Sequence, residues 1–251
     1  MTDSVLIEER HGDVLLLTLN RPERLNALNA GLHHLLGDAV ARAPGEGVKV
    51  IVLTGAGAKS FCSGGDMVEM SGLEKDRVAL PPPEERKNGT VELTNTPLPV
   101  LAAINGYCYG GGLRLALACD IRLASETATF RNPGAEYGLV VGAAVLPRLV
   151  GASRAKDWIF TARTFDSAEA LSSGLVSSLH APDDLLSAAL DMAALIATRS
   201  TEAVQQAKRI VDLASLDEVA RVEEDAANRR LRGSPEQSER FRNATRRVTG
   251  R

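Results

Sequence analysis

The stretch that decides the fold is Ile104–Asp120, INGYCYGGGLRLALACD, in which three consecutive glycines lead directly into an apolar helix. A buried apolar run, LPVLAA, precedes it at 98–103, and CDIRLAS at 119–125 reads as a further strand. Continuous apolar runs of this length suit strands that are buried on both faces. The stretch therefore predicts a strand, a glycine-rich turn, a helix and a further strand, an order typical of an α/β fold.

Strand and helix patterns extend from there toward the N-terminus. Residues 4–9 and 13–19 predict two strands joined by a tight turn, and VKVIVLTG at 48–55 predicts another strand buried on both faces. Between them, the apolar spacing predicts a helix that opens at Pro22. Its apolar positions are 25, 28, 32, 35, 36 and 39.

Helices dominate the rest of the chain. A helix is expected at 84–95, ATFRNPGAEYGLVVG at 128–142 reads as a loop, and beyond residue 142 the pattern is mostly helical. The later helices are expected at 142–162, 167–172, 182–199, 200–213, 216–230 and 235–246.

Composition excludes several classes of protein. The 251 residues are 44% hydrophobic and 24% charged, with a net charge of −3, as in an ordinary globular protein. The charge gives no basic excess for nucleic acid, and 4% aromatic residues offer few stacking platforms. No apolar run approaches the roughly 20 residues of a membrane span. The N-terminal residues show no secretory pattern, so we expect a cytoplasmic protein without nucleic-acid or membrane partners.

The cysteines and histidines do not form a recognisable site. Cys62, Cys108 and Cys119 lack metal-ligand spacing and are expected to be reduced, buried thiols of a cytosolic protein. The four histidines also lack that spacing, and no Ser/His/Asp order stands out. They are His11, His33, His34 and His180. We therefore expect no bound metal.

Two glycine-rich loops follow predicted strands, TGAGAKSFCSGGDM at 54–67 and NGYCYGGGLR at 105–114. Neither is a known phosphate loop, because Ala58 stands where the Walker pattern needs glycine and Ser60 where the dinucleotide pattern needs one. One such loop alone could simply make a turn. Two together favour an oxyanion hole, with one N–H group from each loop facing a carbonyl oxygen that becomes negative, as in a thioester enolate.

Several motifs, in order and correctly spaced, carry a family resemblance. They are NRPERLNALN at 20–29, FCSGGDM at 61–67, AAINGYCYGGGLRLALACDIRLAS at 102–125, FRNPGAEYGL at 130–139, LPRLVGASRA at 146–155 and EALSSGLVSSL at 169–179. The chain resembles the crotonase superfamily, the enoyl-CoA hydratases and isomerases, over nearly its whole length. The resemblance implies a ββα spiral in residues 1–195 and a helical region in 196–251 that supports a homotrimer or a dimer of trimers. It implies a coenzyme A thioester as substrate and no separate cofactor.

The resemblance also implies roles for individual residues. Gly65 and Gly111 match the donors of the oxyanion hole. The residues that match the coenzyme A groove are Arg24, Ala27, Ser63, Asp66 and Met67. Two alternatives stay open: Arg24 as an ordinary surface cation and Asp66 as a helix N-cap.

Both acid/base glutamates of the family's hydratases are missing. Arg114 stands at the first position and Gly134 at the second. Arginine stays protonated and cannot act as an ordinary general base, so efficient hydration is not expected. Glu136 is the candidate replacement, either as a lone base or paired with Arg114, although it could equally face solvent. Arg114 itself has three open roles: binding a carboxylate on the acyl group, pairing with an acid, or turning away from the pocket.

Two functions from different classes follow. The first is a crotonase-type enzyme that stabilises a thioester enolate in a backbone oxyanion hole and carries out isomerisation, decarboxylation or another enolate reaction. The second is a non-catalytic acyl-CoA binding or carrier protein, which the missing glutamates favour. A purely structural partner subunit is a third possibility, and it would bind no coenzyme A.

Overall fold

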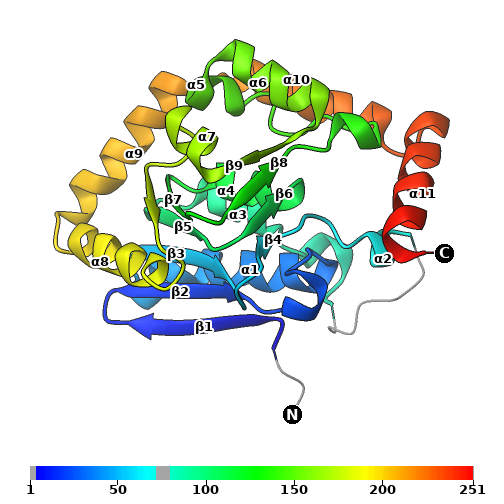
Figure 1. The fold of residues 1–251 in the computed structure, drawn as a ribbon. Coiled ribbons are helices and arrows are strands. Elements are labelled where there is room, and N and C mark those ends of the chain that lie inside the picture. The colour runs from blue at the N-terminus through cyan, green and yellow to red at the C-terminus, as the bar shows by residue number, and fades with distance from the viewer. Residues whose placement is uncertain (1–3, 72–79, 251) are drawn as a thin grey trace.

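The computed structural model describes residues 4–71 and 80–250 and consists of two sheets surrounded by helices (Figure 1). The larger sheet has the strand order β1-β2-β3-β5-β7-β10. The first two strands form an antiparallel hairpin, and the other neighbours pair in parallel. The bounds are β1 Leu6–His11, β2 Val14–Leu19, β3 Val50–Gly55, β5 Val100–Ile104, β7 Ile121–Ser125 and β10 Ser178–His180.

The central strands β3 and β5 are buried on both faces, as their apolar runs predict. One face packs against α8 (Leu185–Ala197), and the other carries the main core together with α1 (Ala30–Arg42) and α4 (Gly111–Ala118). Burying each large apolar side chain of this core contributes about 1.5–3 kcal/mol.

The smaller sheet was not predicted. Its order is β4-β6-β8-β9, with β4 Ser60–Cys62, β6 Tyr107–Tyr109, β8 Thr129–Arg131 and β9 Thr164–Asp166. Strands of three residues are too short to show a period of two, and they lie in segments that read as loops. The first three of them follow directly on β3, β5 and β7, so the chain repeats a unit of two strands and a helical segment. These repeats form the ββα spiral that the resemblance implies.

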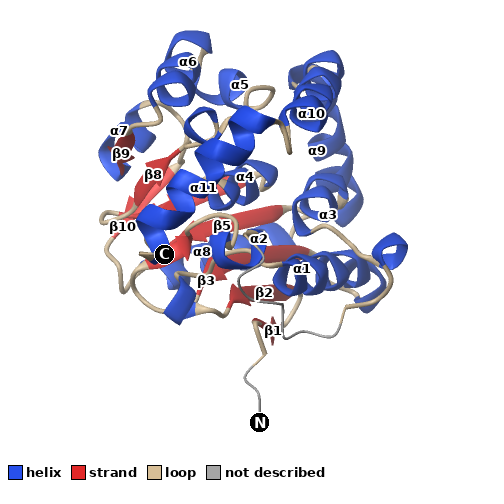
Figure 2. Ribbon diagram, turned by 90° about the vertical axis from the view of Figure 1, so that its right-hand side faces the viewer, coloured by secondary structure: helices blue, strands red, loops and turns tan. Residues whose placement is uncertain are grey.

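The remaining helices follow the predicted order. They are α2 Met67–Met70, α3 Gly89–Asn95, α5 Leu146–Val150, α6 Ala152–Thr161, α7 Ser167–Ser172, α9 Thr201–Ser215, α10 Glu218–Leu231 and α11 Pro235–Thr249. Short 3-10 turns are η1 Pro22–Arg24, η2 Ala43–Glu46, η3 Pro83–Glu85 and η4 Ala135–Tyr137. The C-terminal helical region is present as α9, α10 and α11, and α11 returns to pack on η4 and α2 (Figure 2). No helix of the described chain is long and apolar enough to cross a membrane.

Three predicted helix boundaries were wrong. The helix expected from Pro22 begins only at Ala30, because Leu25 and Asn26 take left-handed φ angles of 52° and 54°. The buried Asn26 side chain holds this turn by donating to two carbonyl oxygens in the segment 56–60 at 3.0 and 2.7 Å. The helix expected at 84–95 begins at Gly89, where Asn88 caps it. The helix expected at 142–162 breaks at Gly151, whose φ is 78°.

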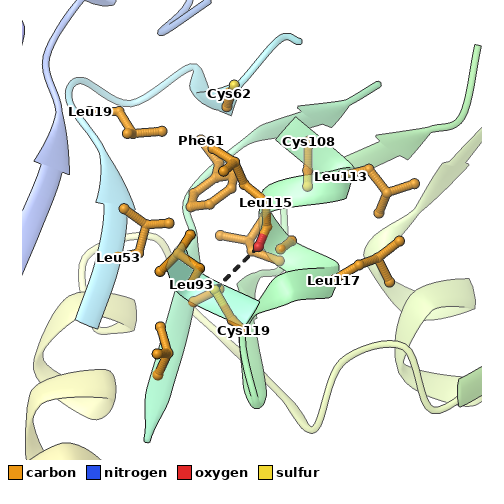
Figure 3. Packing of buried hydrophobic residues seen from close by; sticks show 14 of the residues in the cluster. Leu19, Leu53, Phe61, Cys62, Leu93, Cys108, Leu113, Leu115, Leu117 and Cys119 are labelled. Atoms are coloured by element: carbon orange, nitrogen blue, oxygen red, sulfur yellow. Dashed lines mark hydrogen bonds between the residues drawn. The ribbon is translucent and has the colours of Figure 1, made fainter. Parts of the chain in front are cut away.

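The interior fixes α4 between the sheets. Figure 3 shows Leu113, Leu115 and Leu117 of this helix among the buried side chains, and all three are nearly inaccessible to solvent. At its C-terminal end, Cys119 donates from Sγ to the Leu115 carbonyl oxygen over 3.3 Å. Because this face of α4 is tightly packed, the position of its first turn is fixed. That turn contains Gly111 and Arg114.

Candidate active site

The first glycine-rich loop, residues 54–67, contains β4. Its last part connects the end of β4 to the start of α2 and lies beside the segment 25–28. Leu28 and Gly65 form an isolated parallel bridge: the Leu28 N–H donates to the Gly64 carbonyl oxygen at 2.7 Å, and the Asp66 N–H donates to that of Leu28 at 2.9 Å. In a parallel bridge the central residue points its own N–H group the other way. The amide of Gly65 therefore points away from Leu28.

The second loop lies against the first. The chain turns at Gly110, with φ 50°, and Gly111 opens α4. A Cβ atom added at Gly112 would lie 2.1 Å from the Cys62 carbonyl oxygen, so only glycine fits there. A Cβ atom added at Gly111 would lie 3.3 Å from the Gly65 nitrogen, which shows how closely the two loops approach.

The amides of Gly65 and Gly111 are free to bind a ligand. Neither N–H group has a hydrogen-bond partner among the residues that the structure describes, whereas the N–H groups of Asp66 and Gly110 donate to the carbonyl oxygens of Leu28 and Arg131. Gly65 is exposed and Gly111 half-buried, so a ligand can reach both. Two neighbouring unpaired donors can bind one oxygen atom that gains negative charge.

Asp66 fixes the conformation of the first loop. Its carboxylate caps α2 by accepting from the N–H groups of Val68 and Glu69 at 3.1 and 3.2 Å, and it forms a 2.7 Å ion pair with Arg21. Burial opposes ionisation, but the Arg21 and backbone hydrogen bonds outweigh it and hold the pKa of the Asp66 carboxyl below its ordinary value. The N-cap alternative is confirmed, and the carboxylate oxygens are already engaged within the protein.

The other residues matched to a coenzyme A groove lie around the same loop. Arg24 is exposed at the end of η1, Ala27 is buried, and Ser63 and Met67 are half-buried. The Ser63 N–H donates to the Leu25 carbonyl oxygen at 3.0 Å, which holds the two segments side by side. The fold thus brings these four residues together, and their contact with a ligand remains a prediction.

Arg114 lies one turn into α4 from Gly111. Its side chain is exposed, and it lines a cavity of ≈ 150 Å³. The walls of this cavity come from α3, α4, α9, α10 and the loop at 142–145. Within the described part of the chain, the Arg114 side chain has no hydrogen bond or ion pair. Of its three open roles, pairing with an acid of this chain is therefore not realised.

Glu136 is committed elsewhere. Its carboxylate pairs with Arg131 at the end of β8, and Arg247 of α11 lies 3.6 Å away. The alternative in which Glu136 pairs with Arg114 is not realised in the described residues, because η4 directs Glu136 toward α11. Its alternative role as an acid/base group remains a prediction, but a carboxylate held by arginine is a weaker base.

Position 134, where the resemblance places the second glutamate of the family's hydratases, has no space for a side chain in this structure. A Cβ atom added at Gly134 would lie 2.9 Å from Val141 Cγ2 and 3.0 Å from the Leu139 carbonyl oxygen. The Leu139 N–H also donates to the Gly134 carbonyl oxygen at 2.8 Å, which closes the loop on itself. Any larger residue at position 134 requires this loop to move.

His33 is a residue that the sequence did not single out. It lies on α1, and its Nδ1 atom is buried without a hydrogen-bond partner in the described residues. Burial first, and the charge of Arg114 second, lower the pKa of His33 to about 4. A neutral imidazole therefore lies near Arg114. The sequence could not indicate this proximity, because a single histidine in a helix shows no pattern and Arg114 is far away in the sequence.

The thiols take no part in the site. Cys62, Cys108 and Cys119 are free and buried, as predicted. Burial raises the pKa of Cys62 and of Cys119 to about 12 and that of Cys108 well above its ordinary value, so none is a ready nucleophile. No cluster of metal-ligating side chains occurs in the residues described.

A family model described as Enoyl-CoA hydratase/isomerase matches residues 9–248. The chain belongs to the enoyl-CoA hydratase/isomerase family. A short-chain-enoyl-CoA hydratase of Clostridium acetobutylicum is 36% identical to this family member over 217 residues, 82% of this chain and 80% of the relative.

Two solved structures extend the likeness to the whole fold. An enoyl-CoA hydratase/isomerase of Pseudoalteromonas atlantica superposes with a TM-score of 0.85 at 29% identity, covering 99% of this chain and 98% of the other. A carnitinyl-CoA hydratase of Mycobacterium avium superposes with a TM-score of 0.84 at 30% identity, covering 95% and 94%. The chain therefore shares the α/β fold of the family, the crotonase superfamily of the sequence analysis.

Proposed function

We propose that this family member is an enzyme that binds an acyl-CoA thioester and stabilises its enolate with the N–H groups of Gly65 and Gly111. The observation that carries the proposal is the pair of unpaired, accessible amides on two touching loops. Preorganised donors of this kind are usually the largest single contribution to catalysis of such reactions. Backbone donors persist when side chains change, so the loss of both glutamates leaves them in place.

Fast hydration is not part of the proposal. Position 114 carries a cation, position 134 is closed by its own loop, and Glu136 is paired with Arg131. Each lost acid/base group costs roughly 10²–10⁴-fold in rate. An isomerisation or another enolate reaction that needs one proton-transfer group fits the site better than addition of water.

The coenzyme A portion would lie along the first loop. Arg24 is exposed beside Ser63 and Met67, where it could meet a phosphate group. The relatives named for short-chain-enoyl-CoA and carnitinyl-CoA act on thioesters, which supports a coenzyme A ester as substrate and no additional cofactor.

A homotrimer or a dimer of trimers is proposed for the assembly. The helices α9 and α10 carry large apolar side chains that are exposed in the described part of the chain. They are Ile210, Val211, Leu213, Val219 and Val222. An interface between copies of the chain would remove these apolar side chains from water, which favours association.

The second candidate is a non-catalytic acyl-CoA binding protein, which the engagement of Glu136 by Arg131 favours. Both candidates bind butyryl-CoA, but only an enolate-forming enzyme exchanges its α-hydrogens with solvent. Incubation in D₂O, followed by mass spectrometry of the thioester, separates them. Deuterium incorporation supports the enzyme, and tight binding without exchange supports the carrier. Absence of binding contradicts both and points to a structural subunit.

A further inference from the structure

Arg114 provides an unused cation beside the proposed enolate site. Its Cα atom lies three residues, or about 4.5 Å of helix rise, beyond that of Gly111. The side chain is exposed to the cavity and has no partner in the described residues. The planar guanidinium matches a carboxylate through two parallel hydrogen bonds, which makes it a ready receptor for that group.

The acidic side chains in the cavity wall form no ion pair with Arg114 in the described residues. They are Asp120, Asp212, Glu224 and Asp225. Asp120 pairs with Lys208 at 2.9 Å, and Asp212 pairs with Arg148 at 3.3 Å. Glu224 accepts hydrogen bonds from two backbone N–H groups of the loop at 142–144, at 2.9 and 2.8 Å. Three of the four acids are thus already satisfied by partners other than Arg114.

His33 is the second unused group. Its buried Nδ1 atom has no hydrogen-bond partner in the described residues. Charged groups also stand on or beside the elements packed around α1: Asp38, Glu69, Lys87 and Glu92. Lys87 and Asp38 form a pair at 3.5 Å, and Glu69 accepts from the N–H group that opens α1 at 3.1 Å. The charge that acts on His33 is that of Arg114.

We propose that the site binds the coenzyme A monothioester of a dicarboxylic acid. Arg114 binds the free carboxylate of its acyl group, and His33 takes up a proton. This inference rests on the proposed acyl-CoA function and specifies the class of acyl group. With the thioester oxygen at Gly65 and Gly111, the acyl group lies beside the first turn of α4, and Arg114 is three residues beyond Gly111 in that helix. The free carboxylate offsets the positive charge that Arg114 exerts on His33, which is the smaller of the two causes that lower the pKa of this imidazole, so the pKa of His33 rises when the ligand binds.

The test compares succinyl-CoA with butyryl-CoA, which have the same number of acyl carbons and differ in the terminal carboxylate. Calorimetry at pH 6 in two buffers of different ionisation enthalpy gives both affinity and proton uptake. We expect succinyl-CoA to bind about 10-fold more tightly or better, the usual value of a charge-assisted pair. We also expect succinyl-CoA binding, and not butyryl-CoA binding, to take up a proton.

Three variants assign these effects to residues. Arg114→Gln should abolish the preference for succinyl-CoA, and His33→Asn should keep most of the preference and lose the proton uptake. Arg221→Gln is the matched control, because Arg221 lines the same cavity from α10 and pairs only weakly, at 3.4 Å, with the exposed Glu218. It should retain both effects.

Each contrary result overturns a defined part. Equal affinity for the two thioesters, or a preference that survives Arg114→Gln, overturns the carboxylate site, as does a preference lost in Arg221→Gln. Proton uptake that persists in His33→Asn overturns the role of His33. Failure of the wild-type protein to bind either thioester overturns the proposed acyl-CoA function and this inference with it, a result distinct from the others.

Discussion

Replacing Gly111 by proline tests the proposed enolate site most directly. Gly111 is the first residue of α4, a position where proline is well tolerated because its fixed φ suits the helix and its missing N–H breaks no helical hydrogen bond. Gly111→Pro thus deletes one of the two donors. Gly111→Ala is the matched control: it keeps the N–H, and its Cβ atom, 3.2 Å from Leu28 Cδ1 and 3.3 Å from the Gly65 nitrogen, introduces crowding at this position without removing a donor.

The expected magnitude follows from the loss of one donor to an oxyanion, about 2.7–4 kcal/mol. At 1.36 kcal/mol per pKa unit, this amounts to a change of about 2–3 in the pKa of a bound ligand that forms an enolate. Acetoacetyl-CoA is such a ligand, and its enolate absorbs in the ultraviolet, so a pH titration of the complex reports enolate stabilisation without requiring turnover. Binding to the wild-type protein should lower the pKa of the ligand, and Gly111→Pro should raise it by about 2–3.

Two results would refute this reasoning. An unchanged pKa of bound acetoacetyl-CoA in Gly111→Pro would show that the amide does not contact the enolate oxygen. Equal changes in the proline and alanine variants would show that crowding against Leu28, not loss of a donor, is responsible. Thermal melting of both variants checks that α4 still forms.

Three further predictions concern the residues around the site. Arg114→Glu alone should leave crotonyl-CoA hydration within about 10-fold of wild type, because Gly134 leaves no room for the second glutamate; a gain above 100-fold would contradict this. Gly112→Ala should cost about 1–3 kcal/mol in urea unfolding, since its Cβ would lie 2.1 Å from the Cys62 carbonyl oxygen, and unchanged stability would contradict the close approach of the loops. His33 should stay neutral in an NMR titration down to a pKa of about 4. Between pH 6.5 and 4, His33 binds a proton in the unfolded chain but not in the folded protein, so the free energy of unfolding of the wild type should decrease as the pH is lowered. His33→Asn lacks this group and should lose less stability over the same range. Equal pH dependence in the two proteins would contradict the prediction.

Prediction from the sequence succeeded where the signal is local. The apolar runs of β3 and β5 were visible as strands because both faces are buried, and the segment 167–172 matches α7. It failed where geometry depends on distant partners. The strand β6 has only three residues, and its pairing with β4 and β8 gives it a regular structure that its composition does not indicate.

The candidate site divides in the same way. The glycine motifs by themselves indicated that two backbone loops can approach closely, and the resemblance predicted from Arg114 and Gly134 that the usual carboxylates are absent. The direction of the Glu136 side chain depended on Arg131 and Arg247, which approach it only after η4 and α11 pack together.

The sequence by itself determined the family and the order of the strand and helix units, and it supplied the two glycines that we propose as backbone donors, because these depend on residues that are neighbours in the chain. Only the tertiary structure decided that Arg114 has no acidic partner in the described chain and that His33 lies within reach of its charge. Electrostatic interactions act through space between groups on α1 and α4, which no periodicity or motif along the chain records.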